Sequence, residues 1–232
     1  MGGEEFADQE RLLRALAEQL KSPLMRIARS AELCLMTDAA PDLRDIEYTA
    51  DMTLRLIDSY LLSVHLQAIP SLDLEPLSVQ AVMQDTAHRL GRLADQYNCD
   101  VRVHSSGRHS LVMGHKGGLE SAMMSLGYAF IESVPVNDVR HTVVLGMHGS
   151  ARGLVAGVFG EQPMTGDALR RARALYGRAL QSFPKSLSAN GAGVFVADAL
   201  MRSMHAPLRT ARHQRLNGLA TTLLPSNQLQ LV

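Results

Sequence analysis

Apolar residues recur every three or four positions in the first part of the chain, as they do on one face of a helix. They are Leu13, Leu16, Leu20, Leu24, Ile27, Ala31 and Cys34. This spacing predicts one long helix over residues 5–36 that packs its apolar face against other helices. Pro23 lies inside the run. Because proline removes a backbone donor and clashes with the preceding turn, we expect a kink or a break there.

A second run with the same period follows a turn over residues 37–42. Its apolar positions are Leu43, Ile46, Ala50, Leu54, Ile57, Leu61 and Val64. The run predicts a helix over residues 41–67, and the short loop between the two helices predicts an antiparallel hairpin. One hairpin has too little core of its own, so we expect two copies to pair as a dimeric four-helix bundle through residues 5–67.

The pattern changes after residues 68–71, the best candidate for a linker. Helical periodicity returns over residues 80–97, 117–134, 167–181 and 192–204, and strand-like segments occupy residues 101–104, 110–113, 142–147, 154–159, 208–212 and 218–224. We interpret the first two strands as flanking a turn at residues 105–107, and the other four as two pairs. The predicted fold class is an all-α helical hairpin followed by an α+β two-layer sandwich. The hairpin spans residues 1–70, and the sandwich, with helices on one face of an antiparallel or mixed sheet, spans residues 71–232.

Composition fits a soluble globular protein of one or two domains, because 46% of the 232 residues are hydrophobic. The sequence contains no long uncharged apolar run, so we expect no membrane helix. The acidic first residues lack the apolar segment of a signal peptide. The two cysteines, Cys34 and Cys99, are too few for a disulfide framework or a zinc site. We therefore expect a cytoplasmic protein.

Charge divides unevenly between the two predicted parts. Residues 1–72 hold 7 basic and 12 acidic side chains, a net charge of −5, and the remainder holds 16 and 11, a net charge of +5. This balance favours docking of an acidic hairpin on a basic sandwich. The arginines within residues 170–178 and 202–215 are interpreted first as a solvated surface and second as a site for an acidic protein. Nucleic acid is not an expected partner, because the chain has no Trp and only 4% aromatic residues for base stacking.

The chain resembles the catalytic core of sensor histidine kinases over nearly its whole length, and residues 18–24 carry the most specific signal. In that family the first helix of a dimerising hairpin reads His-Glu-Leu-Arg-Thr-Pro-Leu around the phosphorylated histidine. Residues 18–24 here read Glu-Gln-Leu-Lys-Ser-Pro-Leu. The residues that keep the register are Leu20, Lys21, Ser22 and Pro23. Residues 54–62 and 72–79 are similar to the end of the family's second helix and to its lead into a GHKL, or Bergerat-type, ATPase domain.

The resemblance also implies that three chemical positions are replaced. Glu18 stands where the family has its phosphoacceptor histidine, and a carboxylate is not the nitrogen nucleophile of that chemistry. Tyr128 stands where an Asn helps to hold Mg²⁺, and a neutral phenol is a poor ligand for that ion. Glu132 lies one turn further along the same predicted helix and could face the same way. Glu161 is the only carboxylate near the position of the Asp that reads adenine.

The family's phosphate-binding glycine box survives in part, as Gly191 and Gly193 directly before a predicted helix. Two interpretations stay open. The segment is either a turn with Asn190 as the N-cap of the helix, or a cradle whose backbone N–H groups hold phosphates.

A preserved hairpin beside replaced chemical positions favours a catalytically inactive pseudokinase without a cofactor. Such a homodimer would regulate or scaffold a two-component-type phosphorelay through protein contacts. The resemblance implies a response regulator or a histidine kinase as its partner. The alternative is an ATP-binding histidine kinase, or a phosphotransfer protein, with unusual active-site residues that use ATP with Mg²⁺. A phosphotransferase of this layout needs a histidine on the first helix, and this helix has none.

Overall fold

The computed structural model describes residues 13, 17, 20, 21, 23–33, 43–69, 71–107, 111–135, 137–162, 169–170 and 191–226. Residues 23–33 form a continuous helical segment, and helix α2 (Leu43–Ala68) follows it. The α2 bounds confirm the predicted second helix to within two residues at its start and one at its end. Among the helices that the structure describes, none combines the length and the apolar composition that crossing a bilayer requires.

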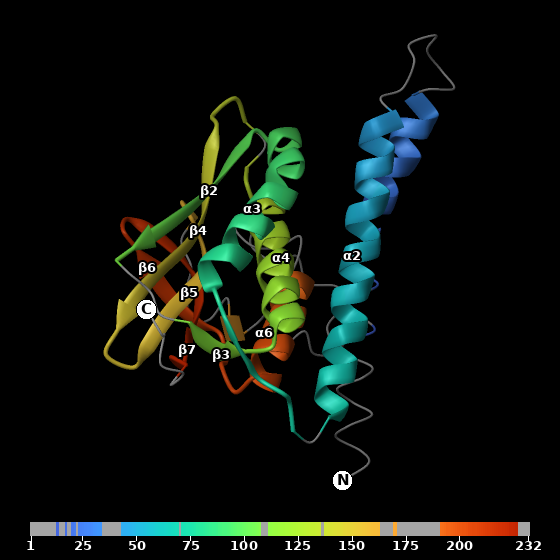
Figure 1. Ribbon diagram of the computed structural model, residues 1–232. Helices are drawn as coiled ribbons and strands as arrows, with labels where there is room; N and C mark the ends of the chain where they lie inside the picture. The colour runs from blue at the N-terminus through green and yellow to red at the C-terminus, as the bar shows by residue number, and fades with distance from the viewer. Residues whose placement is uncertain are drawn as a thin grey trace.

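A two-layer α/β sandwich follows the helices. Its helices are α3 (Val79–Gln96), α4 (Lys116–Glu132) and α6 (Gly191–Ser203). Its strands are β1 (Glu75–Leu77), β2 (Cys99–Ser106), β3 (Val112–Gly114), β4 (His141–Ser150), β5 (Gly153–Gly160), β6 (Arg209–His213) and β7 (Leu216–Leu223). Five strands form a mixed sheet in the order β2-β4-β5-β7-β6, in which only the β2–β4 pair is parallel. In Figure 1 the helices α3, α4 and α6 lie between this sheet and α2.

Local sequence explains where these helices begin and why one of them is so apolar. Ser78 precedes α3 and its side chain accepts a hydrogen bond from the Ala81 N–H, and His115 caps α4 by accepting from the Gly118 N–H. α4 contacts α3 and α6 at its sides, α2 on one face and β5 on the other. A helix in that position has almost no solvent-exposed side, so its sequence is apolar nearly all round.

One apolar core joins α2 to the sandwich. Met52 and Leu56 of α2 are 2% and 0% exposed and belong to the same buried cluster as Leu126 of α4 and Leu200 of α6. The expected docking of the hairpin on the sandwich is therefore present for α2, and apolar side chains form it. The apolar face of α2 that the sequence predicted is not the one buried on the sandwich, since Leu54 on that face is 58% exposed.

The face of the sheet opposite the helices is strongly curled. Strands β2 and β6 are the two edges of the sheet, yet His104 Nδ1 and His213 Nε2 lie only 2.8 Å apart. The approach of His213 to His104 requires glycine at residue 146. A Cβ there would lie 2.8 Å from His213 Cδ2. His213 is buried and stacks near His148 and Phe159. Burial, and then the neighbouring His104 and His148, lower the pKa of His213, so its ring is neutral at pH 7.

Most predicted elements are confirmed, and the structure adds strand pairings that the sequence did not predict. The pairs β4–β5 and β6–β7 are antiparallel as expected. The segments around residues 105–107, in contrast, do not pair with each other. β2 pairs with β4 of the large sheet, and β3 pairs with β1, a strand that the sequence analysis missed. The helix predicted over residues 167–181 lies outside the described residues except for its helical positions 169 and 170.

The glycine at residue 146 offers a test of the curled sheet. Gly146→Ala should lower the free energy of unfolding by about 1–3 kcal/mol, because the new methyl group overpacks against the buried His213 ring. Gly149→Ala on the same strand is the matched control, since a Cβ there meets nothing within 4 Å. Urea unfolding followed by circular dichroism measures both. Equal stabilities of the two variants would contradict the packing described.

Candidate functional site

Tyr128 is completely buried in α4 and forms the centre of a polar cluster at the junction of hairpin and sandwich. Arg26, from the helical segment 23–33, donates to the Tyr128 hydroxyl through Nη2 over 3.3 Å and to Gln96 Oε1 through Nη1 over 3.0 Å. Its guanidinium also lies 5.3 Å from the centroid of the Tyr97 ring, a cation–π contact. We call Arg26, Gln96, Tyr97, Tyr128 and Glu132 the arginine latch. It ties the first helical segment to the last turns of α3 and α4.

Burial within the arginine latch keeps Tyr128 a neutral phenol. Burial is the main cause that raises the pKa of Tyr128, the Glu132 carboxylate acts in the same direction, and the Arg26 charge opposes them. Glu132 accepts a hydrogen bond from the Tyr97 hydroxyl over 3.3 Å. Both residues that the resemblance places at the metal position are thus engaged in contacts within the protein. A buried neutral hydroxyl held by an arginine is also unsuited to Mg²⁺, which prefers carboxylate, amide and water oxygens.

Tyr48 of α2 makes a second polar contact with the sandwich. Its hydroxyl donates to the Arg89 carbonyl over 2.7 Å and accepts from the Leu93 N–H over 3.2 Å. These two backbone groups lie four residues apart in α3 and are natural partners in an α-helix. The hydroxyl therefore bridges them. The Arg92 guanidinium lies 5.7 Å from the Tyr48 ring and covers it.

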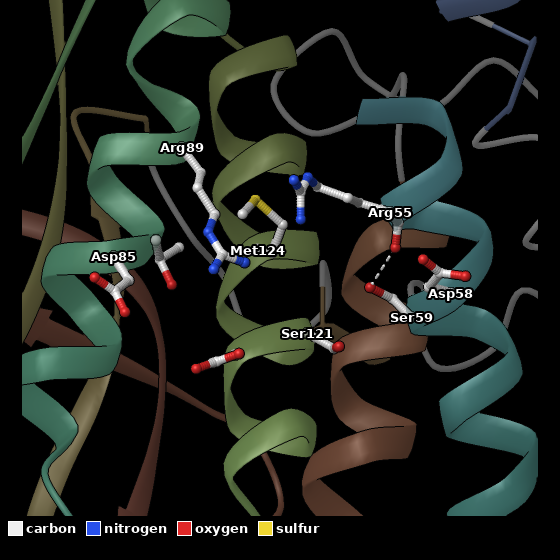
Figure 2. Close-up of a pocket in the computed structure, with 9 residues that line it drawn as sticks. Arg55, Asp58, Ser59, Asp85, Arg89, Ser121 and Met124 are labelled. Carbon is white, nitrogen blue, oxygen red and sulfur yellow. Dashed lines mark hydrogen bonds between the residues drawn. The ribbon is translucent and has the colours of Figure 1, made fainter. Parts of the chain in front are cut away.

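A cleft of about 110 Å³ lies between α2, α3 and α4. Figure 2 shows Arg55 of α2 and Arg89 of α3 approaching Met124 of α4 from opposite sides. The carboxylates of Asp58, Asp85 and Glu120 and the hydroxyls of Ser59, Thr86 and Ser121 complete the lining. Within the described residues no ion pair joins Arg55 or Arg89 to a carboxylate of the cleft. Glu120 pairs with Lys116 at 4.0 Å. The cleft thus presents charges of both signs where α2 meets the sandwich.

The other predicted site residues lie apart from the arginine latch. Glu161 Oε2 is 2.8 Å from His141 Nδ1, and its side chain lines a groove on the outer face of the sheet with Thr142. Glu161 and Tyr128 consequently lie on opposite sides of the sheet, and the structure does not bring them together. Gly191 begins α6, and Gly193 is buried in its first turn.

The phosphoacceptor motif is only partly described. Pro23 is buried, Leu20 is half-buried and Lys21 is exposed. Glu18 and Ser22 lie outside the described residues, as do Asn190 and the rest of the segment that precedes α6.

Sequence reasoning missed Arg26 and Tyr48, the residues that hold the hairpin on the sandwich. Arg26 lies 102 residues from Tyr128 and Tyr48 lies 41 residues from Arg89, so no local pattern marks either pair. Each lies inside a continuous helix, where a single polar side chain is ordinary, so the sequence offered no signal for either residue. Within the described ranges no group of three or more His, Cys, Asp or Glu side chains is arranged to hold a metal ion.

The fold is similar to that of histidine kinases. The histidine kinase AdeS of Acinetobacter baumannii superimposes with a TM-score of 0.53 at 12% identity, over 90% of this chain and 98% of that one. Full-length ShkA superimposes with a TM-score of 0.54 at 16% identity, over 94% of this chain and 46% of that one. The catalytic domain of the histidine kinase ThkA gives a TM-score of 0.52 at 7% identity, over 66% of this chain and 96% of that one. No protein-family model and no curated protein matches the sequence.

These similarities establish the architecture of the chain. N-terminal helices followed by an α/β sandwich with a five-stranded mixed sheet superimpose on a histidine kinase over 90% of this chain. At such low identity the likeness concerns the fold alone.

The Tyr48 bridge should contribute measurably to the attachment of α2. Tyr48→Phe leaves the Arg89 carbonyl and the Leu93 N–H without the bridging hydroxyl, and we expect a loss of about 1–3 kcal/mol in the free energy of unfolding. Tyr60→Phe on the same helix is the control. Its hydroxyl takes part in no hydrogen bond among the described residues, so it should change stability by less than about 0.5 kcal/mol. Chemical denaturation that shows the reverse order would overturn the assignment.

Proposed function

We propose that the protein is a catalytically inactive, histidine-kinase-like homodimer of the cytoplasm. It regulates or scaffolds two-component-type signalling through contacts with a response regulator or a histidine kinase. The observation that carries the proposal is that α2 has two apolar faces. One of its faces is buried on the sandwich of its own chain, and a second apolar face is left open. The hairpin of residues 1–70 then acts as the dimerising module, and residues 71–232 as the attached ATPase-like sandwich.

The open face of the hairpin has the spacing of a helix–helix interface. Leu54 and Leu61 lie one heptad apart on α2 and are 58% and 56% exposed, and Leu43 at its start is 68% exposed. Leu24, on the corresponding seam of the first helical segment, is 53% exposed. Apolar rows of this kind on a soluble protein mark an interaction surface. A second copy of the same hairpin fits best, because it brings an identical pair of seams and closes a four-helix bundle with a two-fold axis.

The replaced chemical positions support the absence of phosphotransfer. Glu18 offers a carboxylate where the reaction needs an imidazole nitrogen. At the metal position Tyr128 has no exposed surface and its hydroxyl is occupied by Arg26. The residue that would help to hold Mg²⁺ in a kinase of this fold instead fastens the hairpin to the sandwich here.

A fixed hairpin suits a scaffold better than a kinase. Phosphotransfer within this fold requires the ATPase domain to approach the acceptor helix and leave it again, so the two parts must move. The shared core of Met52 and Leu56, the Tyr48 bridge and the arginine latch all oppose such movement. A docked pair of modules instead presents one constant surface to a protein partner.

The oligomeric state tests the proposal. The wild-type protein should elute as a dimer at micromolar concentration when size exclusion is coupled to light scattering. Leu54→Glu combined with Leu61→Glu should weaken dimerisation by at least about 100-fold, because four buried leucines of the symmetric interface become charged. Val139→Glu is the control, since Val139 is 60% exposed on the sandwich and lies away from both seams.

Far-UV circular dichroism confirms that each variant is folded. A wild-type protein that stays monomeric over this range, or a folded double variant that stays dimeric, would exclude the seam as the interface.

A further inference from the structure

We propose that the groove on the outer face of the sheet binds a small organic anion, with Arg215 and Arg102 taking its charged group and Val144 and Leu216 its apolar body. The groove lies on the side of the sheet away from α2 and the arginine latch. The inference does not rest on the proposed function. It assigns a binding site to a part of the molecule that neither dimerisation nor partner docking through the hairpin uses.

The size of the groove suits a small ligand. Its volume is about 600 Å³, and ligand pockets of proteins usually fall between roughly 300 and 1,000 Å³. Residues from β2, from β4 and from the turn between β6 and β7 form its walls. A bare inorganic anion would leave most of this space empty, so the occupant needs an organic body.

The floor of the groove is apolar. Val144 on β4 is 6% exposed and belongs to a small separate core on this face, against which Leu216 packs. Arg102 stands opposite Val144 in the parallel register of β2 and β4. An apolar surface of this kind next to a charged wall favours a molecule with a flat hydrophobic part and a single anionic group.

One wall is held in place by an unusual turn. Gln214 has a φ of 55°, in the left-handed region that residues other than glycine seldom adopt. Its Nε2 lies 2.9 Å from His104 Nε2, and His104 Nδ1 lies 2.8 Å from Nε2 of the buried His213. This chain of contacts clamps the turn across the sheet and places Arg215 at the groove.

The charges around the groove leave it positive. No ion pair or hydrogen bond engages the Arg215 side chain within the described residues. Arg102 gives one nitrogen to Asp100, which Arg140 also contacts. Glu161, the acidic residue of the lining, lies 2.8 Å from His141 Nδ1, and the two arginines outnumber this one carboxylate. An incoming carboxylate, sulfonate or phosphate therefore meets one arginine without a partner and a second with free N–H groups, the side chain best suited to planar anions.

The fluorescent probe 8-anilinonaphthalene-1-sulfonate has both required parts and tests the site on the full chain. We expect saturable binding that Arg215→Gln weakens by about 10-fold or more, as loss of a charged hydrogen bond predicts. Arg102→Gln should act in the same direction. Arg152→Gln is the control, because Arg152 is exposed in the β4–β5 turn and lies outside the groove, and it should change the dissociation constant less than twofold.

Two further measurements separate this site from other sources of fluorescence. N-phenyl-1-naphthylamine, which keeps the rings and lacks the sulfonate, should bind at least about 10-fold more weakly. The Leu54→Glu/Leu61→Glu variant should retain the groove site.

Three results would overturn the proposal. The first is an unchanged dissociation constant in both arginine variants. The second is equal affinity for the neutral probe. The third is displacement of the sulfonate probe by a hexaglutamate peptide at lower concentration than by 2-naphthoate, which would assign the groove to an acidic protein segment.

Discussion

The packing of α2 against α4 and α6 is the interaction on which the rest of the molecule depends. Leu56 has no exposed surface and Met52 almost none, so the hairpin and the sandwich share one core. Small hydroxyl residues lie on the same face of α2, and Thr53 and Ser59 satisfy their own hydroxyls by donating to carbonyls one turn earlier. Their small size lets the helices approach closely. Ser63 of α2 and Ser125 of α4 are also buried in this region, but their hydroxyls have no hydrogen-bond partner among the described residues. The position of α2 then determines where Tyr48 bridges α3.

This arrangement gives Tyr128 a structural role in place of a chemical one. A side chain that binds a metal must reach a space that the ion can enter, whereas the Tyr128 ring is enclosed within the helical layer. The hydroxyl instead receives Arg26, and the same guanidinium covers Tyr97 and contacts Gln96. Tyr128, at the position that the resemblance assigns to a metal ligand, thus anchors the first helical segment. In the proposed function, the absence of phosphotransfer and the fixed arrangement of the two parts have a common physical origin.

The sequence predicted the elements whose periodicity is a direct result of their surroundings. α2 and α3 repeat every three to four residues because one side of each is buried, and β4 and β5 lie next to each other along the chain. Pairings between distant segments could not be predicted this way. The parallel partner of β2 begins 35 residues after β2 ends, and β1 is too short to show alternation. Periodicity predicted an apolar row on α2 that includes Leu54 and Leu61, but it did not reveal the face that Leu56 occupies, which is the one buried on the sandwich. The site residues were placed by resemblance alone, and therefore Arg26 and Tyr48, which no family motif contains, were missed.

Phosphorylation is the most informative measurement. The purified wild-type protein is incubated with radiolabelled ATP and Mg²⁺, beside an active histidine kinase as the positive control. Label bound to the protein is counted under conditions that preserve phosphohistidine and acyl phosphate. A buried Tyr128 and a carboxylate at residue 18 predict no label above that of heat-denatured protein. Time-dependent labelling that requires the folded chain would contradict an inactive scaffold and would assign the molecule to the kinases.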